Sequence, residues 1–137
     1  MGISYVGIRV TDLARSIRFY TEGLGLVESK RGRMSHGGTW VSMKDPETGF
    51  NLELNWYPAD SPYATPFTPG EGLDHLGVDV KDARATIERL CAFGGKVAVA
   101  PWVEEGRYVI GFVEDPDGNW VEVQSPLPGA TGPSAPS

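Results

Sequence analysis

The sequence predicts an α+β fold in which two β-α-β-β-β modules form a curved, incomplete barrel of eight strands. Three observations support this fold class. The chain contains an internal repeat, eight segments alternate between apolar and polar residues, and in each copy of the repeat an aspartate separates the first strand from a helix.

The repeat aligns residues 5–27 with residues 75–97 without a gap, at an offset of 70. Six positions are identical, whereas roughly one or two matches are expected from average residue usage. The identical pairs are Gly7 and Gly77, Val10 and Val80, Asp12 and Asp82, Ile17 and Ile87, Gly25 and Gly95, and Val27 and Val97. The offset falls to 69 after the turns at residues 45–49 and 115–118, so that Glu53 aligns with Glu122.

Each copy begins with an alternating apolar run, residues 5–10 or 75–80, which is typical of a strand with one buried face. Asp82 then supplies a helix N-cap, and apolar residues follow at helical spacing as far as Gly94. Asp12 to Gly23 repeats this pattern. Three further strands are predicted in each copy, at residues 26–33, 38–44 and 50–57, and at residues 96–103, 107–114 and 119–125.

We expect a single domain over residues 1–125, because 137 residues that are 40% hydrophobic can bury one sizeable core. Module 1 spans about residues 3–57, a linker rich in proline and glycine spans residues 58–71, and module 2 spans about residues 72–125. Residues 126–137 contain little apolar surface and are expected to form a flexible tail.

The composition limits the partners of the chain. A net charge of −6 and an isoelectric point near 4.8 argue against nucleic acid or an anionic membrane surface as a partner. No apolar run approaches the roughly 20 residues of a membrane span. We therefore expect a cytoplasmic protein that acts on a small molecule.

The alternation of side chains along the predicted strands indicates a polar cavity. Side chains two apart on a strand share a face, so four strands place polar or titratable residues on the face opposite the helix. These residues are Tyr5, Arg9, Asn51, Glu53, Asn55, Tyr57, His75, Asp79, Trp120, Glu122 and Gln124. Such groups are costly in a dry core, which favours a cavity on this face.

The repeat also indicates a metal site. If a pseudo-twofold axis relates the copies, Tyr5 approaches His75 and Glu53 approaches Glu122. An imidazole and two carboxylates suit Zn²⁺, Ni²⁺, Co²⁺, Mn²⁺ or Fe²⁺, and a phenol is an occasional ligand. A divalent cation would also remove the repulsion between the two carboxylates.

Several segments carry a family resemblance: Arg15-Ser16-Ile17-Arg18-Phe19-Tyr20, Gly23-Leu24-Gly25-Leu26, Leu52-Glu53-Leu54, Asp74-His75-Leu76-Gly77-Val78 and the run from Phe112 to Glu122. They resemble the vicinal oxygen chelate superfamily, and most of all its glyoxalase I (lactoylglutathione lyase) type. The resemblance covers roughly residues 3–125. It implies metal ligands at Tyr5, Glu53, His75 and Glu122, with Tyr5 in place of the usual histidine or glutamine.

The resemblance further implies a lyase or isomerase in which a small hydroxycarbonyl or thiol-adduct substrate chelates the metal ion. Glu122 would be the base that moves a proton, with Glu53 as its counterpart. Family members often form homodimers, so the ligands come from one chain or from two. An epimerase is a related possibility, whereas a ring-cleaving dioxygenase is disfavoured because the predicted cavity offers one histidine.

The resemblance gives Arg9 a role in binding a substrate carboxylate, and Asn55 and Trp120 share its cavity face. An Arg9–Asp79 ion pair is the alternative for Arg9. The segment from Glu104 to Arg107 lacks the lysine expected for glutathione.

A metal-free binding protein of the bleomycin-resistance type is the alternative function. Tyr5 favours it, whereas Glu53, His75 and Glu122 together argue against it. Of the tryptophans, only Trp120 is expected in the cavity, because aromatic residues on strands are more often part of the core.

Overall fold

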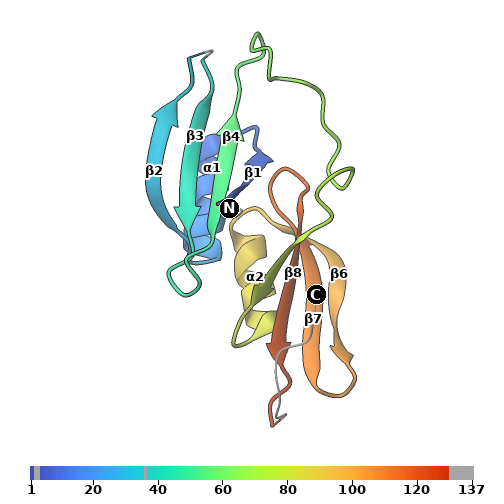
Figure 1. Ribbon diagram of the computed structural model, residues 1–137. Coiled ribbons are helices and arrows are strands. Elements are labelled where there is room, and N and C mark those ends of the chain that lie inside the picture. The colour runs from blue at the N-terminus through green and yellow to red at the C-terminus, as the bar shows by residue number, and fades with distance from the viewer. Residues whose placement is uncertain (2–3, 36, 130–137) are drawn as a thin grey trace. The chain divides into compact units, whose positions relative to one another are not determined.

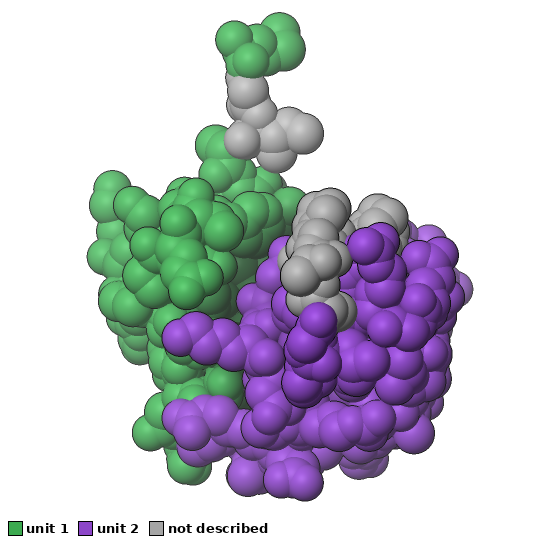
Figure 2. All heavy atoms as spheres, turned by 90° about the horizontal axis from the view of Figure 1, so that it is seen from below, with its two compact units in different colours: residues 1–67 green, residues 68–137 purple. Residues whose placement is uncertain are grey.

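The computed structural model describes residues 1, 4–35 and 37–129. The chain divides into two compact units, Met1–Phe67 and Thr68–Ser137, which are coloured separately in Figure 2. Each unit contains one predicted module. The predicted tail reaches beyond the described residues, because residues 130–137 lie outside them.

The two units have the same order of elements and the same sheet topology (Figure 1). Unit 1 contains β1 (Val6–Arg9), α1 (Leu13–Arg18), a π-helical turn η1 (Phe19–Gly23), β2 (Val27–Arg33), β3 (Thr39–Lys44) and β4 (Asn51–Trp56). Unit 2 contains β5 (Leu76–Asp79), α2 (Ala83–Ala92), β6 (Lys96–Glu104), β7 (Tyr108–Glu114) and β8 (Trp120–Pro126). The sheet orders are β1-β4-β3-β2 and β5-β8-β7-β6, which confirms the predicted α+β class and both β-α-β-β-β modules.

The first and last strands of each module are parallel neighbours, and the other neighbouring strands are antiparallel. Gly7 pairs with Glu53 in unit 1, and Gly77 pairs with Glu122 in unit 2. The register of the repeat is therefore the same in both sheets.

The two helices begin at the predicted aspartates. The side chain of Asp12 accepts a hydrogen bond from the backbone N–H of Arg15, and Asp82 accepts one from Ala85, both at 3.1 Å. Each carboxylate satisfies one of the donors that the first turn of a helix leaves unpaired. The same residue type at the same position thus begins the helix in each module.

The helix ends differ by one residue between the modules. Gly25 and Gly94 both have positive φ, although the gapless alignment pairs Gly25 with Gly95. In unit 1 the chain passes through η1, and Leu26 N–H donates to Tyr20 O, six residues back, whereas Gly95 N–H donates to Leu90 O, five residues back. The π-helical turn accommodates the extra residue.

Each core lies between the helix and one face of its sheet. The buried apolar residues of unit 1 include Ile8, Val41, Met43, Leu52 and Leu54, and those of unit 2 include Ile87, Leu90, Val113, Val121 and Val123. Strand residues in these sets alternate with the residues predicted to line a cavity. The cavity candidates therefore lie on the face of each sheet that the helix does not cover.

The predicted linker is divided between the two units, because residues 58–67 belong to unit 1. Just after β8, Leu127 N–H donates to Arg107 O at 2.6 Å. Across the described residues, no helix combines the length and the apolar character that a membrane span requires.

Gly111 provides a test of the core of unit 2. A Cβ atom at this position would lie 2.7 Å from Ile87 Cδ1 and 3.2 Å from Pro101 Cα, so we expect Gly111→Ala to lower the free energy of unfolding by about 1–3 kcal/mol. Ile87→Val removes Cδ1. The double variant should therefore lose less stability in chemical denaturation than the sum of the two single variants, and additive losses would show that this contact is not the cause.

Candidate functional site

In unit 2, His75 and Glu122 lie together on the face away from α2. His75 Nε2 is 3.7 Å from Glu122 Oε2, and His75 Nδ1 is 2.6 Å from Asp74 Oδ2. In the tautomer with its proton on Nδ1, the ring donates to Asp74 and presents the lone pair of Nε2 toward Glu122. A histidine that ligates a metal is commonly held in this way by a carboxylate on its other nitrogen.

The Glu122 carboxylate fits a cation. Glu122 is 5% exposed, and its Oε1 atom is buried without a hydrogen-bond partner, as is Oε1 of Gln124 on the same strand face. A buried acceptor without a partner costs free energy, and a carboxylate oxygen is a suitable ligand for a divalent ion. The donor set of His75 Nε2 and Glu122 is therefore suited to hold a metal.

Aromatic side chains flank this pair. The ring of Phe112 lies edge-on to His75 with centroids 5.5 Å apart, and it also contacts Trp120 at 5.5 Å and stacks on Trp102 at 6.2 Å. We call Trp102, Phe112 and Trp120 the aromatic cluster. Of the three, only Trp120 is predicted on this face from the sequence; the pairing of Phe112 with Glu122 across β7 and β8 places Phe112 there as well.

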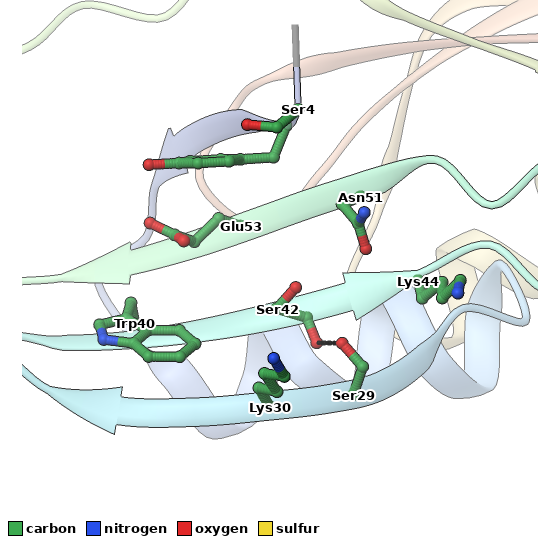
Figure 3. A pocket seen from close by; sticks show the side chains of 9 residues that line it. Ser4, Ser29, Lys30, Trp40, Ser42, Lys44, Asn51 and Glu53 are labelled. Carbon is green, nitrogen blue, oxygen red and sulfur yellow. Dashed lines mark hydrogen bonds between the residues drawn. The ribbon is translucent and has the colours of Figure 1, made fainter. Parts of the chain in front are cut away.

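In unit 1, Glu53 and Tyr5 line a cavity of about 380 Å³ (Figure 3). The cavity is lined by Ser4, Tyr5, Ser29, Lys30, Trp40, Ser42, Lys44, Asn51 and Glu53. Tyr5 precedes β1 and is 52% exposed. Trp40, expected in the core, instead lines this cavity.

Burial raises the pKa of the Glu53 carboxyl above its ordinary value, and a hydrogen bond from Asn55 offsets part of this effect. The Asn55 side chain also donates to the Glu53 carbonyl oxygen at 3.3 Å. A Cβ atom on Gly7 would lie 2.8 Å from Asn55 Nδ2, so glycine at this position leaves room for the amide. Asn55 thus lies beside Glu53, on the face where it was predicted.

Arg9 contacts the segment that follows β4. Its guanidinium donates to Tyr63 O at 2.8 Å and to Thr65 O at 2.9 Å, and it lies over the rings of Tyr57 and Phe67. These contacts fix residues 63–67 to β1. A substrate carboxylate at Arg9 would compete with two backbone carbonyl oxygens of the chain itself.

Neither unit taken by itself holds three His, Cys, Asp or Glu side chains close enough to bind a metal ion, within the described residues. Unit 2 contains His75 and Glu122, and unit 1 contains Glu53 and Tyr5, which line the same cavity. Each unit therefore carries part of the ligand set that the repeat predicts.

The model of the Glyoxalase/Bleomycin resistance protein/Dioxygenase superfamily matches residues 2–123 of the chain. The lactoylglutathione lyase of Haemophilus influenzae is 35% identical over 128 residues, which cover 89% of this chain and 90% of that protein. The probable chloroplastic lactoylglutathione lyase of Arabidopsis thaliana is 34% identical over 119 residues, or 83% of this chain. The chain spans 33% of the length of the Arabidopsis protein.

The fold of the chain is also similar to that of a solved structure. A glyoxalase I mutant from Zea mays superposes on the chain with a TM-score of 0.73 at 28% identity. The superposition covers 91% of this chain and 47% of the maize chain.

The raised pKa of Glu53 predicts a pH-dependent effect on stability. The native state holds this proton more tightly than the unfolded state, so the contribution of Glu53 to stability falls as the pH rises through its pKa. We therefore expect Glu53→Gln to stabilise the metal-free protein more at about pH 7 than at about pH 4. These two pH values lie above and below the ordinary pKa of a glutamate carboxyl.

Thermal unfolding at both pH values measures this effect. Glu47→Gln, in the exposed turn between β3 and β4, is the matched control, because it removes the same charge from a solvated position. A Glu53→Gln protein whose gain in melting temperature does not increase with pH would contradict the expected role of burial.

Proposed function

Since the chain belongs to the Glyoxalase/Bleomycin resistance protein/Dioxygenase superfamily, we propose that it is a metal-dependent lyase or isomerase of the glyoxalase I type. Its substrate would be a small hydroxycarbonyl compound or a thiol adduct. The relatives named lactoylglutathione lyase support this reaction class. The observation that carries the proposal is the His75–Glu122 pair, with His75 held by Asp74 and one Glu122 oxygen buried without a partner.

The proposed ligands are Glu53, His75 and Glu122, with Tyr5 at the fourth position. When bound, a divalent cation would polarise a substrate carbonyl and stabilise the negative charge that develops as a proton leaves the adjacent carbon. Asp74 orients His75, so that Nε2 rather than Nδ1 is directed to the site. The expected homodimer and cytoplasmic location remain part of this proposal.

Glu122 is the proposed proton acceptor, because its buried carboxylate has an oxygen that no protein donor occupies. Glu53 is its counterpart in the repeat, and a raised pKa brings a carboxylate closer to the range in which it accepts protons well at neutral pH. Phe112 lies edge-on to His75, and Trp120 packs against Phe112; the two rings would shield the reacting atoms from water.

The thiol that forms the adduct remains to be identified by assay. In this chain the β6–β7 hairpin closes tightly, with positive φ at Glu105 and Gly106, and Glu104 accepts a hydrogen bond from Trp102 Nε1 at 2.6 Å. The loop of this hairpin, Glu104 to Arg107, supplies no lysine for a glutathione carboxylate. Methylglyoxal should therefore be assayed with glutathione and with other thiols in parallel.

Metal content tests the proposal directly. After reconstitution with each candidate ion, the purified protein is expected to retain about one ion per chain, and Glu122→Gln should retain less than about a tenth of that amount. The reason is that an amide is a poorer ligand than the carboxylate that it replaces. Elemental analysis measures the bound ion, and the methylglyoxal assay measures turnover.

Glu88→Gln is the matched control, because Glu88 is exposed on α2 and carries the same charge. It should bind metal and turn over substrate as the wild type does. Failure of the wild type to retain any of the ions would refute the metal-dependent enzyme and favour a metal-free binding protein of the bleomycin-resistance type.

Asp74→Asn tests the orientation of His75 separately. Loss of a carboxylate that orients a metal-bound histidine typically lowers metal affinity about 10–100-fold. Asp74 is exposed, so the variant should fold normally, and a competitive chelator titration should show the weaker affinity. An unchanged affinity would mean that Asp74 does not position His75 for a ligand.

A further inference from the structure

The face of the unit 1 sheet that carries Glu53 also carries two lysines. Lys30 pairs with Ser42 across β2 and β3, and Ser42 pairs with Glu53 across β3 and β4. Lys44 lies two residues beyond Ser42 on β3, opposite Asn51. The side chains of Lys30, Ser42, Lys44 and Asn51 line the same cavity, and each is labelled in Figure 3.

A β-bulge turns Lys30 toward this face. The register shifts between Glu28 and Lys30: Glu28 pairs with Met43, and Lys30 pairs with the next residue of β3, Ser42. Without the bulge, Glu28 and Lys30 would share a face, because side chains alternate along a strand. With it, Glu28 lies on the side of the buried Met43, and Lys30 lies on the side of the cavity.

Glu28, the acidic residue nearest to Lys30 along β2, is paired with Arg31 and not with Lys30. Glu28 accepts two hydrogen bonds from the Arg31 guanidinium, at 2.6 and 3.0 Å, and this contact lowers the pKa of Glu28. Neither Lys30 nor Lys44 has an ion-pair partner in the part of the chain that the structure describes. Among the described residues, this cavity thus holds two lysines without an ion-pair partner and one carboxylate, that of Glu53, although the chain has a net charge of −6.

Neutral donors and a flat ring complete the surroundings. Ser42 lies opposite Lys30 and Asn51 lies opposite Lys44 in the sheet, and both line the cavity. The Ser29 hydroxyl donates to the Ser42 carbonyl at 3.2 Å. A Cβ atom on Gly32 would lie 2.6 Å from the indole of Trp40, so glycine allows this ring to lie against β2. The cavity therefore combines positive charge with hydrogen-bond donors and an aromatic surface.

We infer that this cavity binds an anionic group of the substrate, a carboxylate or a phosphate, between Lys30 and Lys44. Diagonal neighbours on adjacent strands are about 7–8 Å apart, a spacing that a single anion can bridge through two long side chains. The anion would relieve the repulsion between the lysines and accept hydrogen bonds from Ser42 and Asn51. The inference rests on the proposed function, because Glu53 lines the same cavity.

An NMR titration of the metal-free, full-length protein tests the inference without requiring turnover. Inorganic phosphate and malonate are added separately at constant ionic strength, and the shifts of the Ser29, Ser42 and Asn51 amides and of the Trp40 indole N–H are followed. We expect saturable shifts at these groups. Saturation with one probe alone identifies the anion, and saturation with both shows that the site accepts either group.

The variant Lys30→Gln/Lys44→Gln should weaken this binding roughly tenfold or more, because it removes the charge-assisted hydrogen bonds. Lys81→Gln/Lys96→Gln is the matched control: it removes the same charge from exposed positions in unit 2 and should leave the dissociation constant unchanged. Both lysines of the cavity are exposed, so the first variant should keep a folded spectrum.

Shifts that do not saturate with either probe, or an equal dissociation constant in the wild type and in the Lys30→Gln/Lys44→Gln protein, would overturn the inference. Normal metal content together with absent anion binding would refute this inference alone. Saturable anion binding in a protein that retains no metal would instead refute the proposed function and leave the anion site established.

Discussion

The parallel pairing of the first and last strands of each module is the constraint on which the candidate site depends. It sets Glu53 opposite Gly7 and Glu122 opposite Gly77. Gly7 is two residues from Tyr5 and Gly77 is two residues from His75, so each pair of positions shares one face of its strand. Hydrogen bonds along the two strands hold this register. A slip of one residue is also disfavoured, because it would turn the carboxylates into the helix-covered core. The buried valines and leucines on the opposite face therefore hold the site residues in place.

Much of this arrangement could be predicted from the sequence, because both repeats follow the two-residue period of a strand. The eight strands, the two aspartate caps and the face that carries Glu53, His75 and Glu122 follow from that period and from the offset of the repeat. Local physical rules decide these features, since a buried face must be apolar along its whole length.

Other features depend on contacts that the strand period does not encode. The carboxylate of Asp74 holds His75 through an exposed position next to the strand, and Arg9 binds backbone carbonyls about 55 residues away rather than a charged side chain. The π-helical turn η1 displaces Gly25 from its alignment with Gly95. Phe112 was also missed, although its pairing with Glu122 follows from the hairpin between β7 and β8.

The bulge at Ser29 shows how the chemistry of such a face can change without any exchange of residue type. Adding or deleting one residue in β2 reverses which side chains of the strand enter the cavity, while the neighbouring strands keep their pairing. A change of one residue in the length of this edge strand would therefore change the chemistry of the cavity and leave Glu53 in place. A comparison that counts only substitutions at the ligand positions would overlook this kind of divergence.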